Sequence, residues 1–178
     1  MNGIASFLDE AATARVQLIW RELETSCGLA GVKATPFPHF SWQVTDGYDL
    51  PRLESILRVL ARQAQPFKVC TAGLGIFTSN NPIVYIPLIK DEVLMHFHLL
   101  LWEQTNGIAI HPSLYYAPDQ WVPHITLAIN DVNRHNLDCA MQYLAYQSFD
   151  WEMQIDNFVF IVQVEDKASE TFRYRFGI

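Results

Sequence analysis

The chain contains the same order of predicted elements twice, and this duplication limits the possible folds more than any other feature of the sequence. In each half, apolar periodicity and capping residues predict a helix, a strand that holds one histidine, a second helix and two strands. The elements of the first half are expected at residues 7–27, around His39, from Asp49 to Gln65, and at about 67–77 and 83–89. Those of the second half are expected from Asp91 to Asn106, around His124, from Leu137 to Leu144, and at about 151–164 and 171–177. The approximate repeat units are therefore residues 1–90 and 91–178.

The spacing around the two histidines supports a real duplication. Leu53, in the second predicted helix, lies 14 residues after His39. Leu137, in the corresponding helix of the second half, lies 13 residues after His124. The two histidines thus occupy equivalent positions in their repeat units.

The expected fold class is α+β. Each repeat unit ends in two strands joined by a short turn, such as residues 78–82, and this pattern favours antiparallel sheets over parallel βαβ units. We expect two pseudo-symmetric lobes, each an antiparallel sheet with helices on its outer face, whose uncovered faces form a central groove. With 178 residues, the chain is sized for a single bilobal domain, residues 1–178.

Capping residues mark the ends of the first predicted helix. Ser6 and Asp9 resemble a capping box at its start, and Gly28 is expected to end it. Asp49 and Asp91 are expected to cap the helices that follow them.

Each histidine strand begins behind a proline and carries a hydroxyl residue two positions after the histidine. The two segments are Pro38-His39-Phe40-Ser41 and Pro123-His124-Ile125-Thr126. Side chains at i and i+2 share one face of a strand, so each segment would present an imidazole and a hydroxyl to the same surface. Because proline cannot donate to a strand ladder, each proline is expected where its strand begins or where no partner is needed.

Strand alternation predicts which neighbours share the groove with these side chains. The positions expected to face the groove are His39, Ser41, Gln43, His124, Thr126 and Ala128. The positions expected to face the helices are Phe40, Trp42, Val44, Ile125, Leu127 and Ile129.

The histidine–hydroxyl spacing alone is a weak signal. The chain has 17 serine and threonine residues and six histidines, so about 0.6 such pairs arise by chance. The alternative is that His39 and His124 are strand histidines bonded to nearby backbone. Their equivalent positions and flanking prolines favour a shared site.

The overall charge restricts the partners of the chain. The net charge is −7 and the pI is near 5.2, so generic electrostatic binding of long nucleic acid is not expected. A small phosphate ester or one end of an RNA remains a suitable ligand. No apolar run is long enough to span a membrane and no signal peptide is recognised, so we expect a cytoplasmic protein.

The three cysteines are expected to be buried, reduced thiols. Cys27, Cys70 and Cys139 are widely separated and show no paired spacing that would suggest zinc or a redox dithiol.

The chain resembles the 2H phosphoesterase superfamily, and especially its 2'-5' RNA ligase-like branch. The resemblance rests on the duplicated layout, on His39-Phe40-Ser41, and on the stretch WVPHITLA that contains His124 and Thr126. It implies a two-lobed α+β fold with one motif from each lobe facing a central groove. It also implies action on 2',3'-cyclic or related cyclic phosphodiesters, while some members join or cleave 2'-5' RNA linkages. Ser41 stands where threonine is commoner in the family, which keeps the hydroxyl donor but loses the methyl group that fixes its rotamer.

Carried over from the family, the catalytic and phosphate-contacting residues are His39, Ser41, His124 and Thr126. One histidine would deprotonate the attacking water and the other would protonate the departing ribose oxygen, because imidazole titrates near neutral pH. This scheme needs no metal or other cofactor, and the sequence does not decide which histidine is the acid. The alternatives are a non-catalytic nucleotide-binding module and a 2'-5' RNA ligase. No protein partner and no other substrate-binding residue is assigned.

Other polar and aromatic residues have two interpretations. In the loop from Gly107 to Pro123, an aromatic ring could stack on a nucleobase or cover the core; the rings are those of Tyr115, Tyr116 and Trp121. Arg173 and Arg175 share a face of the last strand and could clamp a phosphate or lie on the surface. The remaining histidines are not expected to form a shared site; they are His96, His98, His111 and His135.

Overall fold

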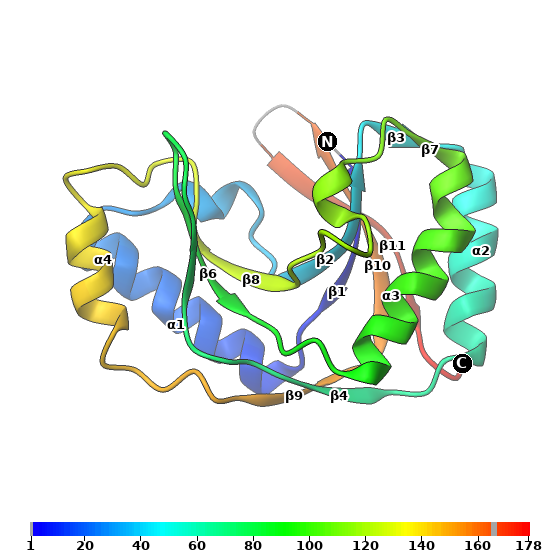
Figure 1. The fold of residues 1–178 in the computed structure, drawn as a ribbon, viewed down its shortest axis with the longest axis horizontal. Helices are drawn as coiled ribbons and strands as arrows, with labels where there is room; N and C mark the ends of the chain where they lie inside the picture. The colour runs from blue at the N-terminus through cyan, green and yellow to red at the C-terminus, as the bar shows by residue number, and fades with distance from the viewer. Residues whose placement is uncertain (1, 165–166) are drawn as a thin grey trace.

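The computed structural model describes residues 2–164 and 167–178. Figure 1 shows helices on both sides of the molecule, with the strands of the largest sheet between them. The helices are α1 (Glu10–Cys27) and α4 (Leu137–Leu144) on the left, and α2 (Leu50–Gln63) and α3 (Glu92–Thr105) on the right. The strands are β1 (Asn2–Phe7), β2 (His39–Thr45), β3 (Gly47–Tyr48), β4 (Phe67–Cys70), β5 (Gly75–Phe77), β6 (Ile83–Pro87), β7 (Ala109–Ile110), β8 (His124–Ala128), β9 (Glu152–Ile155), β10 (Asn157–Val164) and β11 (Lys167–Arg175). Three short 3-10 helices are η1 (Gly31–Ala34), η2 (Asn106–Ile108) and η3 (Leu114–Tyr116).

The strands form antiparallel sheets, which confirms the predicted α+β class. The largest sheet has the order β11-β10-β1-β2, and a second has the order β5-β6-β8. The strand pairs β4-β9 and β3-β7 complete the set in the described residues. Each sheet joins strands from both repeat units, since β10 and β11 pair beside β1 and β2, and β8 pairs with β6. The two histidine strands, β2 and β8, each form the edge of a sheet.

The ends of the helices follow the capping residues that the sequence indicates, with one correction. The carboxylates of Asp9, Asp49 and Asp91 each accept a backbone N–H in the first turn of the following helix. Gly28 ends α1 with a φ of 70°, the left-handed conformation that glycine adopts without strain. The predicted capping box is wrong at Ser6, because Ser6 lies in β1 and its hydroxyl is buried against Trp42 and Asn157.

Strand β1, which the sequence pattern does not predict, lies between β10 and β2 in the largest sheet. Its residues Ile4, Ala5 and Ser6 are all fully buried. A strand that is covered on both faces shows no polar–apolar alternation, and this run is short. Its identity therefore depends on partners distant in the sequence.

Two predicted strands are each divided in the structure. The segment expected at 67–77 forms β4, which pairs with β9, and β5, which pairs with β6. The segment expected at 151–164 likewise forms β9 and β10. In both cases the chain passes from one sheet to another, and a continuous apolar run gives no sign of this change of partner.

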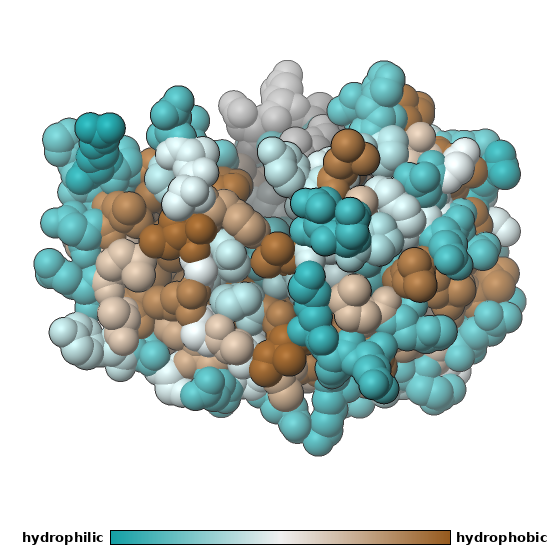
Figure 2. Space-filling model, in the orientation of Figure 1, coloured by the Kyte–Doolittle hydropathy of each residue, from teal (hydrophilic) through white to brown (hydrophobic). Residues whose placement is uncertain are grey.

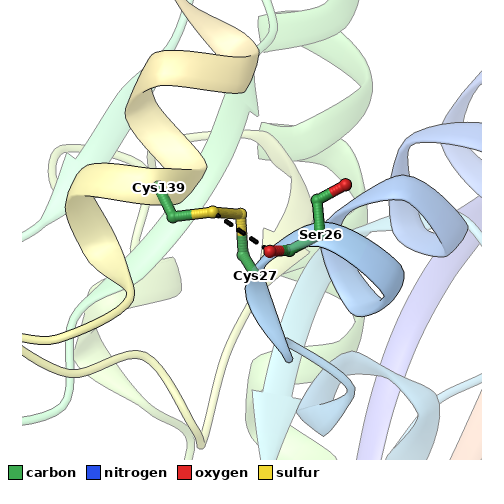
Figure 3. The surroundings of a disulfide bond; sticks show 3 residues. All are labelled: Ser26, Cys27 and Cys139. Atoms are coloured by element: carbon green, nitrogen blue, oxygen red, sulfur yellow. Dashed lines mark hydrogen bonds between the residues drawn. A yellow bond between two sulfur atoms is a disulfide. The ribbon is translucent and has the colours of Figure 1, made fainter.

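The prediction of three reduced cysteines is wrong for two of them. Cys27 and Cys139 form a disulfide that joins the end of α1 to α4, as Figure 3 shows. Cys139 Sγ also lies 3.4 Å from the carbonyl oxygen of Ser26, a van der Waals contact because a disulfide sulfur carries no hydrogen to donate. The cysteines are separated by 112 residues, so only packing of the two helices brings them together. Cys70 is a free thiol.

An aromatic cluster fills the core beneath β2. Trp42 is fully buried and stacks on Trp121, whose ring stacks on His98 with a centroid distance of 3.7 Å. Phe40 and Phe158 pack edge-on against Trp42. Burial of each such ring contributes about 1.5–3 kcal/mol, so this cluster strongly fixes the position of β2.

Candidate active site

The two histidine segments line one cavity of about 390 Å³. His39 and Ser41 reach it from β2, and His124 and Thr126 reach it from β8. The edge strands β2 and β8 contact each other, which brings the two segments together. All four residues predicted to form the site therefore meet in one place.

Each imidazole is held by a hydrogen bond to the backbone two residues earlier. His39 Nδ1 lies 2.6 Å from the carbonyl oxygen of Phe37, and His124 Nδ1 lies 2.7 Å from that of Val122. A carbonyl oxygen can only accept, so Nδ1 of each ring must carry the proton. This leaves Nε2 of each neutral ring as an acceptor, in the state that a general base requires.

The flanking prolines fit this arrangement. Both β2 and β8 begin at the histidine, so Pro38 and Pro123 directly precede the ladder, as the sequence predicts. Proline places the residue before it in an extended conformation. The carbonyl of Pro38 accepts a hydrogen bond from the N–H of Leu8, and that of Pro123 accepts one from Leu88. These bonds hold the backbone at the start of each histidine strand.

A β-bulge in each histidine strand changes the predicted alternation. In β2 the pairing with β1 skips Trp42, and in β8 the pairing with β6 skips Leu127. Each skipped residue lies three positions after its histidine, so the bulges are duplicated with the motifs. An extra residue reverses the faces of all that follow.

The bulges correct four of the predicted orientations. Gln43 and Ala128 were expected in the groove but are buried, whereas Val44 and Ile129 were expected against the helices but line the cavity. Gln43 Oε1 instead accepts hydrogen bonds from the hydroxyls of Tyr48 and Thr105. The positions up to and including each bulged residue follow the simple alternation, since Trp42 and Leu127 are buried as expected.

The environment lowers the pKa of both histidines. Burial is the main cause in each case, since it disfavours the charged imidazolium, and the bond to the backbone carbonyl partly opposes it. For His124, a positive charge on His39 lowers the pKa further. The site therefore accepts one proton more readily than two, as an acid–base pair requires.

Aromatic rings surround His124. The ring of Phe77 meets it edge-on at a centroid distance of 4.9 Å, and that of Tyr85 lies at 5.1 Å. Gly75 leaves room for Tyr85, because a Cβ there would lie 2.3 Å from the phenol ring. No sequence pattern predicts this contact, which arises only when β6 pairs with both β5 and β8.

The loop before β2 forms another wall of the cavity. Gly31 lines it, and Asp131 Oδ2 accepts hydrogen bonds from the backbone N–H groups of Ala30 and Gly31, both at 2.7 Å. A Cβ on Gly31 would lie 2.1 Å from the carbonyl oxygen of Ile129. Gly31 and Asp131 thus hold the loop against the end of β8, and neither belongs to a motif that sequence analysis could recognise.

The aromatic residues of the loop from Gly107 to Pro123 fall into three environments. Tyr116 lines the cavity, where burial raises the pKa of its phenol and a hydrogen bond with Ser41 opposes the shift. Trp121 is fully buried in the core, and Tyr115 is 84% exposed. The ring of Tyr116 therefore lies where it could contact a substrate, whereas the ring of Trp121 covers the core.

The described residues that line the cavity include no lysine, arginine, aspartate or glutamate. On the face in view, Figure 2 shows apolar side chains gathered over β6 and β8, with hydrophilic ones beside them near the centre and around the edge. The phosphate-clamp interpretation of the two arginines is wrong. Arg173 pairs with Glu170 at 2.7 Å and Arg175 with Asp156 at 3.4 Å, outside this cavity.

The other histidines do not line the cavity. His98 is buried, while His96, His111 and His135 are exposed. Within residues 2–164 and 167–178, no three His, Cys, Asp or Glu side chains are grouped so that they could hold a metal ion. None of the helices in the same residues is both long and apolar enough to cross a bilayer.

Comparisons with known proteins show a family and a similar fold. The family model of the 2'-5' RNA ligase superfamily matches residues 8–167. The fold is similar to the crystal structure of TT0787 of Thermus thermophilus, with a TM-score of 0.66 and 16% sequence identity, over 99% of this chain and 97% of that chain. No curated protein matches the sequence.

Proposed function

The chain belongs to the 2'-5' RNA ligase superfamily, and from this membership we propose that it is a metal-independent phosphodiesterase. Its substrates would be 2',3'-cyclic or related cyclic phosphodiesters of nucleotides or RNA ends. The observation that carries the proposal is the pair of imidazoles, His39 and His124, whose Nδ1 atoms are held by backbone carbonyls while both rings line one cavity.

The reaction follows from the chemistry of the two rings. The Nε2 atom of one neutral histidine takes a proton from water, whose oxygen attacks the phosphorus. The bond from phosphorus to one ribose oxygen breaks, and the other histidine, protonated, gives its proton to that oxygen. The hydroxyls of Ser41 and Thr126 donate to the non-bridging phosphoryl oxygens as charge develops. The product is a ribose phosphomonoester.

The neutral lining of the cavity favours a singly charged substrate. A cyclic phosphodiester carries one negative charge, which one imidazolium can balance. A phosphomonoester carries about 1.5 to 2 negative charges at pH 7. Since no lysine or arginine lines the cavity in the described residues, the product should bind more weakly than the substrate and leave after the bond breaks.

Incubation with the four nucleoside 2',3'-cyclic phosphates, with and without a chelator, tests the proposal. We expect phosphomonoester product in both conditions. Tight binding without turnover would instead identify a nucleotide-binding module, and loss of turnover with chelator would contradict a metal-independent reaction. A gel shift with tRNA halves at physiological salt tests the ligase alternative, and we expect no shift because the net charge is −7.

Substitution of the histidines tests the site itself. His39→Ala and His124→Ala should each lower kcat by about 10² to 10⁴, the range typical of general acid–base catalysis, while the circular dichroism spectrum stays unchanged. His111→Ala is the control, because His111 is 83% exposed and lies outside the cavity. Full activity in both single variants would contradict the assignment.

A further inference from the structure

Two tryptophans donate hydrogen bonds to the backbone of the two hydroxyl residues in the candidate site. Trp121 Nε1 lies 3.0 Å from the carbonyl oxygen of Ser41. Trp20 Nε1 lies 3.0 Å from the carbonyl oxygen of Thr126. Each motif therefore receives the same contact at its hydroxyl residue, at the same distance.

These carbonyls belong to the edge strands β2 and β8. The outward backbone groups of an edge strand have no ladder partner, and a partly buried carbonyl without a donor is destabilising. Both indole contacts are partly buried. An indole N–H satisfies the carbonyl and fixes the backbone from which the catalytic hydroxyl projects.

Neither indole is free to move. Trp121 is fully buried and lies between His98 and Trp42 in the aromatic stack. Trp20 is 8% exposed on α1, the helix that packs against β8. Rings with defined packing hold their N–H groups in one direction, so each carbonyl has a fixed donor.

The two contacts cross between the repeat units. Trp20 belongs to residues 1–90 and holds Thr126, whereas Trp121 belongs to residues 91–178 and holds Ser41. We propose that Trp20 and Trp121 are positioning residues that set the placement of the two hydroxyls relative to each other. This inference rests on the proposed phosphodiesterase function, since it concerns how well the hydroxyls meet the phosphoryl oxygens.

Replacement by phenylalanine removes the N–H and keeps a ring, so Trp20→Phe and Trp121→Phe test the proposal. Trp151→Phe is a matched control, because Trp151 is also 8% exposed and its Nε1 donates to the carbonyl of Ser148 at 2.9 Å, away from the cavity. We expect kcat for a 2',3'-cyclic nucleotide to fall about tenfold in the first two variants, with little change in KM, because small displacements of positioned groups slow catalysis strongly. The control should keep its kcat.

The melting temperature separates positioning from a structural role. The proposal holds if Trp20→Phe and Trp121→Phe lower the melting temperature no more than Trp151→Phe does, while their kcat falls and that of Trp151→Phe does not. If their kcat equals that of the control, the proposal is overturned. Should Trp121→Phe not fold, Trp20→Phe decides by the same criteria.

A readout independent of turnover distinguishes failure of the inference from failure of the proposed function. In NMR spectra, the carbonyl carbon of Thr126 should shift in Trp20→Phe, and that of Ser41 in Trp121→Phe. Absence of these shifts would contradict the contacts themselves. If the shifts occur but the wild type turns over no cyclic phosphate, the proposed function fails while the two backbone contacts stand.

Discussion

Burial of His39 and His124 determines the pH at which a two-histidine site would work. Both pKa values lie below that of free imidazole, because the cavity disfavours the charged form of each ring. The hydrogen bonds to the carbonyls of Phe37 and Val122 raise the two pKa values, but burial lowers them by more. At neutral pH both rings are thus mainly neutral in the free protein.

We therefore predict an acidic optimum for kcat/KM. The active form needs one neutral and one protonated histidine, and its population is greatest between two pKa values that both lie below about 6.5. Activity should fall as the pH rises toward neutrality, since the acid loses its proton, and should fall again at low pH, where the base gains one. A pH profile of kcat/KM for a 2',3'-cyclic nucleotide measures this. An optimum above pH 7 would contradict it.

At the scale of the elements, the packing of α3 against β2 depends on a neutral histidine. His98 is fully buried, and its Nε2 lies 3.1 Å from the carbonyl oxygen of Trp42. Burial lowers the pKa of His98 to about 4. In the unfolded chain His98 takes up a proton near pH 6.5, whereas in the folded protein it stays neutral down to about pH 4. The free energy of unfolding is therefore greatest above pH 6.5 and decreases as the pH falls toward 4.

Replacing His98 should flatten the dependence of stability on pH. Between pH 7 and pH 4.5 the ring accounts for a loss of about 2 to 3 kcal/mol in the free energy of unfolding. His98→Phe keeps a ring to stack on Trp121 but cannot titrate, so this part of the loss should disappear in denaturant unfolding. His96→Phe, an exposed position on the same helix, should keep the full dependence. An unchanged slope in His98→Phe would contradict the prediction.

The disulfide between α1 and α4 should stabilise the oxidised protein. It closes a long loop, since its cysteines are 112 residues apart, and such links contribute about 2 to 4 kcal/mol. Cys27→Ser should lower the free energy of unfolding by this amount without reductant, and dithiothreitol should bring the wild type to the same value. Cys70→Ser is the control, because Cys70 is not in the disulfide. Identical wild-type stability in both conditions would contradict the prediction.

The disulfide also bears on the cytoplasmic location that the sequence led us to expect. The cytoplasm of most cells keeps such pairs reduced. A cytoplasmic protein would therefore carry Cys27 and Cys139 as thiols until it is exposed to oxidant. Alkylation of freshly lysed cells followed by mass spectrometry of these two cysteines tests the location, because a fully oxidised pair points to an oxidising compartment.

The bulges show how far a local pattern predicts orientation. Alternation from His39 correctly places Ser41 in the cavity and Phe40 in the core, and the same is true from His124 to Thr126. It fails at Gln43 and Ala128, one residue after each bulge. The failure has the same cause in both strands. One extra residue lies opposite the neighbouring strand without a pairing partner, and the sequence of the histidine strand does not indicate where this happens.

At the scale of the whole molecule, the repeat units depend on each other. The sheet that carries His39 takes β10 and β11 from the second unit, and the sheet that carries His124 takes β5 and β6 from the first. The core is likewise continuous between the units, because Trp42 packs on Trp121 and Phe158. The site exists only where these exchanged strands bring β2 and β8 together.

We predict that neither repeat unit folds alone. Residues 1–90 would lack two strands of the largest sheet, and residues 91–178 would lack the partners of β8, so both would expose apolar strand edges. Each fragment should show no cooperative thermal transition by circular dichroism, and mixing the two should restore one. A cooperative transition in either isolated fragment would contradict the prediction.

The amino-acid sequence was enough to predict the α+β class, the helices with their aspartate caps, and the four residues that meet in the cavity. Periodicity and capping chemistry are contained in short segments, and the duplicated motif is found by comparing the two halves of the sequence. The exchange of strands between units, the place of β1, the Cys27–Cys139 link and the indole contacts of Trp20 and Trp121 became visible only in the folded molecule. Each of these contacts joins residues far apart in the sequence. Burial and hydrogen bonds stabilise them, and these exist only once the whole chain has packed.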